Sequence, residues 1–291
     1  MTSAISQLVL SGRLFTGRSA STREARMDDL ARYSDPENLC NALMQARGKG
    51  VNAVFSLAEE NLIKALKLMR KKLGPAGEFQ PFNFLPVIPN VLGYVREATE
   101  YGLAGAGMRR LLRVGPMGFM RASTRGALNA PKVMHKDFPT LLSILYELEM
   151  GELHAFKPPV VFLHHQMTDI ALSLGNARIL REYAGIMRKR FKVEPGLCTT
   201  NFVRLADYLV EWDIPIQVIA APCNEKAYLM PGGVDAYRKR LESGRFTLVA
   251  DRPSSESPTP SDAIDWCLDQ PNVGAVIVDA EIQRIPAART A

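Results

Sequence analysis

The sequence predicts an α/β protein folded as a (β/α)8 barrel of the TIM type, and three observations support this fold class. Short apolar runs alternate with segments of helical periodicity along all 291 residues, as in parallel strands joined by crossover helices. Most runs are continuously apolar, as expected for strands covered on both faces. No GxGxxG opens the first crossover, so an open doubly wound sheet is the alternative and the barrel is favoured.

The expected strands are eight short runs rich in leucine and β-branched residues. They span Gln7–Leu14, Val51–Leu57, Phe82–Ile88, Val160–His165, Gly196–Thr199, Ile216–Ala221, Phe246–Ala250 and Val273–Val278. The segments between them carry apolar residues at helical spacing. Helices are expected after Ser34 and over Glu59–Leu73, Ala177–Phe191, Val203–Trp212, Val234–Leu241 and Pro260–Asp269. Ser34 and Thr259, each placed just before a helix start that contains proline, are the expected caps.

One connection is much longer than the dozen or so residues that a crossover needs. Between the third and fourth strands lie a glycine-rich stretch, the basic stretch Met108–Arg113 and an apolar helix from Phe138 to Met150. We therefore expect a helical insertion over 102–157 within a single barrel domain spanning 1–291. The basic stretch is interpreted first as a solvated helix face and second as an anion or partner site. The apolar helix would cover the barrel floor or pair two subunits, so a homodimer or a protein partner through 102–157 is left open.

Composition excludes several classes of protein. A hydrophobic content of 47% is too high for a disordered chain. The net charge of +6 is small and spread along the chain, so nucleic acid is not an expected partner. The four cysteines form no CxxC pair, and no apolar run approaches the roughly 20 residues of a membrane helix. We expect a cytoplasmic protein; the basic first 23 residues resemble a transit peptide, but Leu8–Leu10 within them predicts a strand instead.

Candidate site residues follow from the fold, because active sites of these barrels lie at the C-terminal ends of the strands. Polar or reactive side chains occupy these positions and would form a mouth suited to a small-molecule ligand. They are Thr16, Ser56, Asn90, His164, His165, Gln166, Asp169, Cys198, Thr199, Thr200, Asn201, Cys223, Asn224, Glu225, Lys226, Asp251, Arg252 and Asp279.

The adjacent histidines are the first candidates for chemistry. Neighbouring strand residues point to opposite faces, so only one of His164 and His165 is expected to face the interior. We assign His164 as the catalytic acid or base and Lys226 as a catalytic amine if it is desolvated. His165, Asn90 and Asn224 are assigned to substrate binding.

The expected mouth has two further features. Arg252 and Ser254-Ser255 follow the seventh strand, where barrels often bind phosphate at a helix N-terminus. Cys198 and Cys223 end neighbouring strands, but no local spacing fixes further ligands, so no metal is predicted and buried apolar cysteine is the default.

The second half of the sequence resembles the aldo/keto reductases. Gly196–Phe202 (GLCTTNF) is similar to their GxSNF segment, and Gln217–Pro222 (QVIAAP) to their Q-x-x-x-x-P strand. Asp262–Val273 is similar to their late helix, and Leu163-His164 fits the strand that carries the family histidine. The resemblance covers the chain from Val160 onward and the first half only by strand order.

This resemblance implies an oxidoreductase barrel that binds NADP or NAD. In that family an asparagine and a glutamine hold the nicotinamide carboxamide, which points to Asn201 and Gln217 and, more weakly, to Thr200. Arg252 would contact the phosphates of the cofactor.

Three of the four catalytic residues of the family are missing from their expected places. Its aspartate and tyrosine follow the second strand, where this chain reads Val54–Glu60 (VFSLAEE). Its lysine ends the third strand, where this chain reads Leu85–Asn90 (LPVIPN). The proton donor of a normal reductase is therefore not in register.

A closer resemblance is to a divergent group of aldo/keto-reductase-like barrels. That group has an early G-x-x-F-[TS]-G, here Gly12–Gly17, and a late P-x-N-x-x-x-[FY]-x-M, here Pro222–Met230. The resemblance predicts the fold and leaves the reaction open. The favoured interpretation is a divergent oxidoreductase-type or repurposed small-molecule enzyme, and the alternative is a non-catalytic barrel that binds a ligand or docks a partner. A fully competent reductase with its catalytic residues supplied from elsewhere is the third interpretation.

Overall fold

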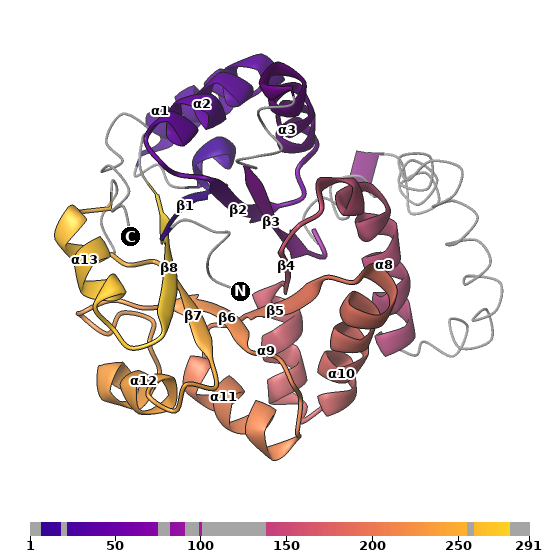
Figure 1. Cartoon of the computed structure of the whole chain (residues 1–291), viewed down its shortest axis with the longest axis vertical. Helices are drawn as coiled ribbons and strands as arrows, with labels where there is room; N and C mark the ends of the chain where they lie inside the picture. Colours follow the sequence, from indigo (N-terminus) through magenta and orange to yellow (C-terminus); the bar gives the residue numbers. More distant parts are fainter. Residues whose placement is uncertain are drawn as a thin grey trace.

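The computed structural model describes residues 7–18, 22–74, 82–90, 99–100, 138–254 and 259–279. Its parallel strands close into a barrel in the order β1 to β8, which confirms the predicted fold class (Figure 1). The strands are β1 (Leu8–Ser11), β2 (Ala53–Leu57), β3 (Asn83–Ile88), β4 (Val160–Leu163), β5 (Glu194–Cys198), β6 (Val218–Pro222), β7 (Thr247–Asp251) and β8 (Val273–Val278). All eight expected strands are present. Most of the expected insertion, including Met108–Arg113, and the first six residues of the chain lie outside the described residues.

Strand side chains alternate between the barrel interior and the surface that faces the helices. On β4, Val160 and Phe162 point inward, whereas Val161 and Leu163 pack with the helices. Gly196 on β5 makes room for the aromatic ring, because a Cβ there would lie 2.6 Å from a ring carbon of Phe162. Both sets of side chains are buried, which is why the strands read as continuous apolar runs.

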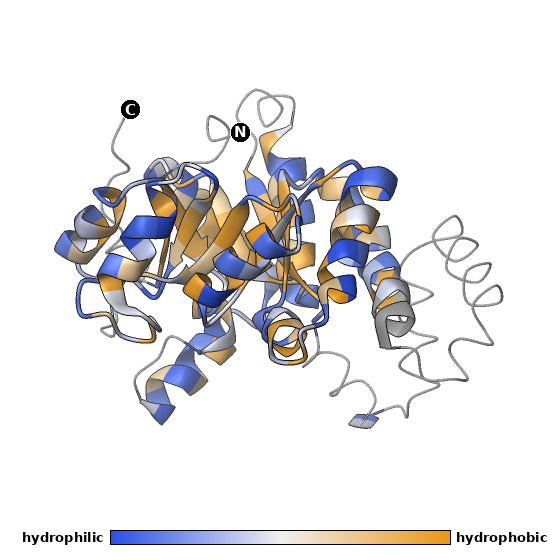
Figure 2. Cartoon of the chain, turned by 90° about the horizontal axis from the view of Figure 1, so that it is seen from below, coloured by the Kyte–Doolittle hydropathy of each residue, from blue (hydrophilic) through white to orange (hydrophobic). Residues whose placement is uncertain are grey.

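Helices surround the barrel and turn their polar faces outward (Figures 1 and 2). They are α1 (Arg23–Arg32), α2 (Pro36–Gly48), α3 (Glu60–Leu73), α8 (Phe138–Leu153), α9 (His165–Ser173), α10 (Ala177–Gly185), α11 (Phe202–Glu211), α12 (Gly233–Leu241) and α13 (Ser261–Leu268). A π-helical segment, η4 (Ile186–Phe191), continues α10, and a 3-10 turn, η3 (His154–Phe156), follows α8. Within the described part of the chain, no helix is long and apolar enough to cross a membrane.

Three strands end earlier than the apolar pattern predicts, β5 by a single residue and β1 and β4 by more, and the ends of β1 and β4 lie at the site described below. β1 ends at Ser11 and the chain turns into η2 (Leu14–Thr16), with Gly17 in the left-handed region at φ 61°. β4 ends at Leu163, and α9 begins two residues later. Leucine, phenylalanine and histidine at these positions fit a strand or a helix start equally well, so the pattern alone could not place the ends.

Both expected helix caps are wrong by one residue. Asp35 rather than Ser34 caps α2, because its carboxylate accepts the Glu37 amide at 2.9 Å. Thr259 does not cap α13; its hydroxyl instead accepts the Asp279 amide at 3.2 Å, which fastens the end of β8. The helices α1 and α9 were not expected from the sequence.

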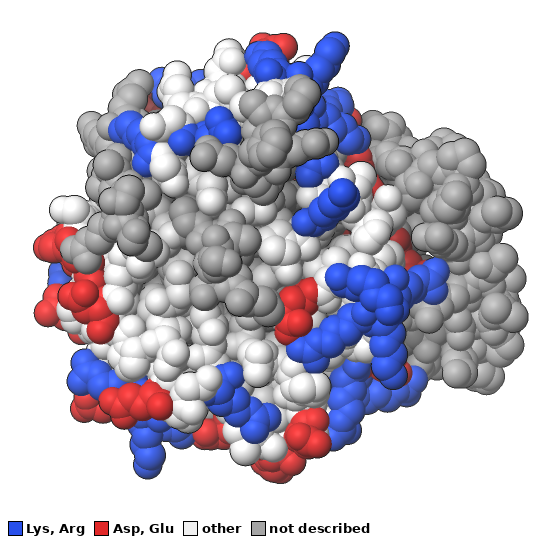
Figure 3. All heavy atoms as spheres, viewed as in Figure 1, with Lys and Arg blue, Asp and Glu red and all other residues white. Residues whose placement is uncertain are grey.

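Basic and acidic side chains are interspersed on the surface. On the face drawn in Figure 3, the largest group of Lys and Arg lies in the region of α8 and α10. Two arginines of the adjoining η4 have acidic partners, Arg188 with Glu194 and Arg190 with Glu147. The Arg188–Glu194 pair is partly exposed, whereas the carboxylate of Glu147 is buried, so this face carries both signs of charge.

Candidate active site

A cavity of about 470 Å³ opens at the C-terminal ends of the strands. Its volume lies within the roughly 300–1,000 Å³ typical of small-molecule sites. Every strand, or the loop that follows it, contributes to the lining. The lining residues are Ser11, Gly12, Arg13, Thr16, Arg18, Phe55, Ser56, Leu57, Glu59, Val87, His164, His165, Cys198, Thr199, Thr200, Ala220, Pro222, Tyr228, Leu229, Asp251, Arg252, Ser254 and Asp279.

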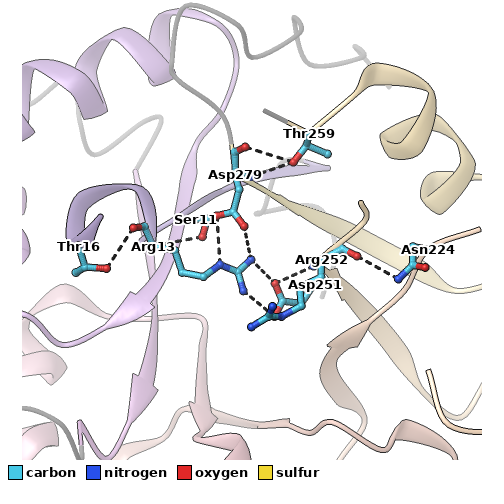
Figure 4. A network of polar contacts seen from close by, with 8 residues as sticks. All are labelled: Ser11, Arg13, Thr16, Asn224, Asp251, Arg252, Thr259 and Asp279. Atoms are coloured by element: carbon cyan, nitrogen blue, oxygen red, sulfur yellow. Dashed lines mark hydrogen bonds and ion pairs between the residues drawn. The ribbon is translucent and has the colours of Figure 1, made fainter. Parts of the chain in front are cut away.

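Arg13 is the centre of an ionic network in the cavity wall (Figure 4). Its Nη2 lies 2.6 Å from Asp251 Oδ1 and 2.7 Å from Asp279 Oδ2, and its Nη1 lies 3.1 Å from Asp251 Oδ2. Its Nε donates to Asp279 Oδ1 at 3.2 Å. Burial lowers the pKa of the Arg13 guanidinium, but the two carboxylates outweigh it and the net pKa is raised. The guanidinium fork therefore ties the ends of β7 and β8 to the loop after β1.

The early glycine motif explains why Arg13 reaches this position. Gly12 lies against Ser56 on β2, and a Cβ at Gly12 would lie 2.0 Å from the serine Oγ. The Thr16 hydroxyl donates to the Arg13 carbonyl at 3.2 Å, and Gly17 closes the turn with its left-handed backbone. The Gly12–Gly17 segment is thus a tight turn built around an arginine that crosses the barrel mouth.

His164 caps α9 with its ring rather than lying in a strand. Its Nδ1 accepts the Gln166 amide at 3.2 Å, and its own amide donates to the Ile88 carbonyl at 2.7 Å. Burial lowers the pKa of His164 to about 4, helped by the charges of His165 and Arg18. The ring is therefore neutral at physiological pH, and with Nδ1 accepting, the proton is assigned to Nε2.

Both histidines line the cavity, so the expectation that only one faces it is wrong. The ring centroids of His164 and His165 lie 4.4 Å apart. The strand alternation behind that expectation does not apply, because β4 ends at Leu163 and the two residues lie at a helix start. Burial also lowers the pKa of His165, as does the charge of Arg252, while nearby aspartates oppose the shift.

The end of β5 is fixed to α9 through Asp169. Its carboxylate accepts the Thr199 hydroxyl at 2.6 Å, and the Thr200 amide and hydroxyl at 3.1 and 2.7 Å. Cys198, the preceding residue, is buried in the wall, and burial with the charges of Asp251 and Asp169 raises the pKa of its thiol. The thiol is therefore protonated. Among the described residues, no cluster of His, Cys, Asp and Glu could hold a metal ion.

Two of the four predicted cofactor residues line the cavity, Thr200 and Arg252. Asn201 instead caps α11, where its Oδ1 accepts the Arg204 amide at 3.2 Å. Gln217 precedes β6 and is exposed at the N-terminal end of the barrel, opposite the mouth. The pair that the resemblance assigns to the nicotinamide carboxamide is therefore not assembled at the cavity, and these residues do not fit that group.

The other predicted binding residues hold loops in place. Asn90 is buried. Its backbone amide donates to the Glu149 carboxylate at 2.7 Å, and its side-chain amide donates to the Ala58 carbonyl at 3.2 Å. Asn224 is buried in the loop after β6. Lys226 is exposed in the same loop and is not among the residues that line the cavity.

Sequence reasoning missed the pairing of Arg13 with the two aspartates that end β7 and β8. The aspartates were recognisable as polar strand ends, but Arg13 lay inside an expected strand. The signal that could have found it is the glycine on each side, since Gly12 and Gly17 mark a turn rather than a strand.

The comparisons with known proteins support the fold. No protein-family model matches the sequence, and no curated protein matches it. Aldose reductase of Giardia lamblia is similar in structure with a TM-score of 0.56 and 12% identity, covering 99% of this chain and 86% of the other. An aldo-keto reductase of Bacillus halodurans in its holo form gives 0.52 and 10%, covering 99% and 89%.

The chain is therefore a closed eight-stranded α/β barrel with a polar cavity at its mouth, and its fold is similar to that of these two reductases. At these identities the likeness concerns the fold. At the ends of β2 and β3 the cavity is lined by Ser56, Leu57, Glu59 and Val87, and no lysine is among its described lining residues. The departures from the reductase pattern noted in the sequence thus hold in the geometry.

Proposed function

We propose that the chain is a small-molecule enzyme that acts on the carbonyl group of a compact anion bound at the barrel mouth. One observation carries the proposal: the neutral His164 ring at the edge of the cavity, with Nδ1 occupied by a helix-start amide. A neutral imidazole held in this way offers its Nε2–H to a carbonyl oxygen and polarises it. His165, with its ring centroid 4.4 Å away, is the group that would exchange a proton with the carbon beside that carbonyl.

Two arginine side chains of the cavity lining support an anionic ligand. Three arginines and three acidic residues line it. The formal charges of these six residues cancel, and both aspartates bind the Arg13 guanidinium, so Glu59 is the remaining acidic residue of the described lining beside Arg18 and Arg252. Both of these arginines lower the pKa of a neighbouring histidine, which places their charges close to the imidazole pair. A carboxylate or phosphate on the ligand would pair with the guanidinium of Arg18 or Arg252.

The proposed chemistry is proton exchange beside the carbonyl, with enolisation as its simplest form. Reduction of the same carbonyl by a nicotinamide is the alternative, which the fold of the similar reductases supports. The positions of Asn201 and Gln217 argue against it, because neither side chain lines the cavity.

The test is solvent exchange at the carbon beside the carbonyl. Pyruvate and other short 2-oxo acids are incubated with the protein in deuterium oxide, and loss of the proton signal is followed by NMR. The His164→Gln variant is expected to lose about a hundredfold in rate, whereas His154→Gln, in η3 and outside the cavity lining, leaves it unchanged. Exchange no faster than in buffer for every compound would overturn the proposal, and NADPH oxidation with the same compounds would establish the reductase alternative.

A further inference from the structure

The loop after β6 holds two apolar side chains at the edge of the cavity. Tyr228 and Leu229 are 48% and 46% exposed, and both line the cavity. Adjacent exposed apolar side chains beside a cavity mark a contact site more often than scattered ones do. The loop ends in Met230, which is buried and anchors it to the core.

The backbone is strained on both sides of Tyr228. Ala227 and Leu229 have φ angles of 51° and 57°, in the left-handed region that favours glycine. A leucine in this conformation carries an energetic cost and persists only where its surroundings enforce it. Here the strain holds a large apolar side chain half exposed, so folding of the loop alone does not explain the choice of residue.

Asn224 enforces this conformation and connects the loop to Arg252. Its Oδ1 accepts the Tyr228 amide at 2.7 Å, and its Nδ2 donates to the Tyr228 carbonyl at 2.9 Å. The same Nδ2 donates to the Arg252 carbonyl at 3.3 Å (Figure 4). One buried side chain thus fixes two apolar side chains and a cationic residue relative to one another at the same cavity.

We propose that Tyr228 and Leu229 form an apolar rim that binds the non-polar substituent of the substrate. With the proposed function as its basis, the inference names the substrate class: an anionic carbonyl compound that bears an aryl or branched alkyl group. The carboxylate or phosphate lies on the side of Arg252, the carbonyl lies at His164, and the substituent lies against the rim. Tyr228 and Leu229 then determine specificity without taking part in the chemistry.

The test compares two acids that differ by one apolar group, phenylpyruvate and pyruvate, by calorimetric titration. The intact protein is expected to bind phenylpyruvate at least about tenfold more tightly, the scale of discrimination that an apolar contact provides. Leu229→Gly relieves the strain and removes the rim side chain, and it should reduce the ratio to less than about threefold. Ala227→Gly is the matched control, since it relieves the same strain at a residue outside the cavity lining, and it should leave the ratio unchanged.

The outcomes separate the rim from the proposed function. Equal binding of the two acids, or equal ratios in the two glycine variants, overturns the rim while leaving the anion site in place. Tyr228→Ala is a second test of the same binding ratio, because it removes the other rim side chain and leaves both strained residues intact. Binding of neither acid overturns the proposed function, and the rim with it.

Discussion

Replacing Arg13 with methionine removes the guanidinium that binds both Asp251 and Asp279. The apolar stem is kept, so the variant tests the charge and its hydrogen bonds rather than packing. Removing one partner of a buried ion pair costs about 3–5 kcal/mol. The three side chains are 23%, 20% and 19% exposed, so solvent screening brings the expected loss of unfolding free energy to about 2–3 kcal/mol.

Urea unfolding followed by the fluorescence of the two tryptophans measures this loss, with stability taken from the midpoint at an unchanged slope. The triple variant Arg13→Met, Asp251→Asn, Asp279→Asn is the control. It removes all three charges, so it should recover a large part of the loss. A loss below about 1 kcal/mol in the single variant, or a triple variant less stable than the single one, would refute this interpretation of the network.

Three other perturbations follow from particular contacts. The pKa of His164 is lower in the folded chain, about 4 against an ordinary 6.5, so its contribution to stability is present above the ordinary value and is lost as the pH falls toward the folded value. A pKa shift of this size corresponds to at most about 3 kcal/mol of unfolding free energy, and to about 1–2 kcal/mol after solvent screening of a partly exposed ring. When urea midpoints are measured against pH, His164→Gln should therefore lose less stability on the acidic side than the intact protein does. Asn224→Ala should lower the free energy of unfolding by about 1–3 kcal/mol in thermal unfolding and weaken phenylpyruvate binding. Asn201→Ala removes a different side-chain amide, the N-cap of α11, and should cost about 1 kcal/mol and leave binding unchanged. Gly12→Ala should destabilise the fold by about 1–3 kcal/mol because its Cβ would meet the Ser56 hydroxyl. Adding Ser56→Gly to the same chain should restore most of the loss. Equal unfolding midpoints with and without Ser56→Gly would contradict this contact.

The barrel could be predicted because its strands are buried on both faces. On β4 and β6 every residue is buried, and a continuous apolar run of that length between helical segments has few other solutions. What the pattern could not give is where a strand stops, since β4 ends at Leu163 and α9 begins at His165 without a break in the local pattern.

The candidate site could be predicted only in outline. The rule that barrel sites lie at strand C-termini located His164, His165, Thr200 and Arg252 at the cavity. The same rule gave Asn224 a binding role, although its side-chain amide hydrogen-bonds to the backbone of Tyr228 in its own loop and of Arg252 in the loop after β7. Whether a strand-end side chain faces the ligand or fastens a loop depends on contacts between distant segments, which sequence spacing does not encode.

The resemblance to reductases was informative about the fold and less so about individual residues. Asn201 sits in a matching motif, yet its side chain serves the first turn of α11. Gln217 sits in a matching strand motif at the end of the barrel away from the cavity. Motif order is retained where it builds the strands and helices, while the cavity is also lined by residues outside these two motifs, such as His165 and Arg252.

The protonation of His164 tests the central claim most directly, because the proposed carbonyl chemistry requires a neutral ring with its proton on Nε2. Nitrogen-15 NMR of the ring nitrogens across an acid titration measures both properties, and His164→Gln assigns the signals among the four histidines. We predict an Nε2–H ring that stays neutral through the physiological range and titrates with a pKa of about 4. A ring that titrates near its ordinary pKa, or that carries its proton on Nδ1, would contradict it.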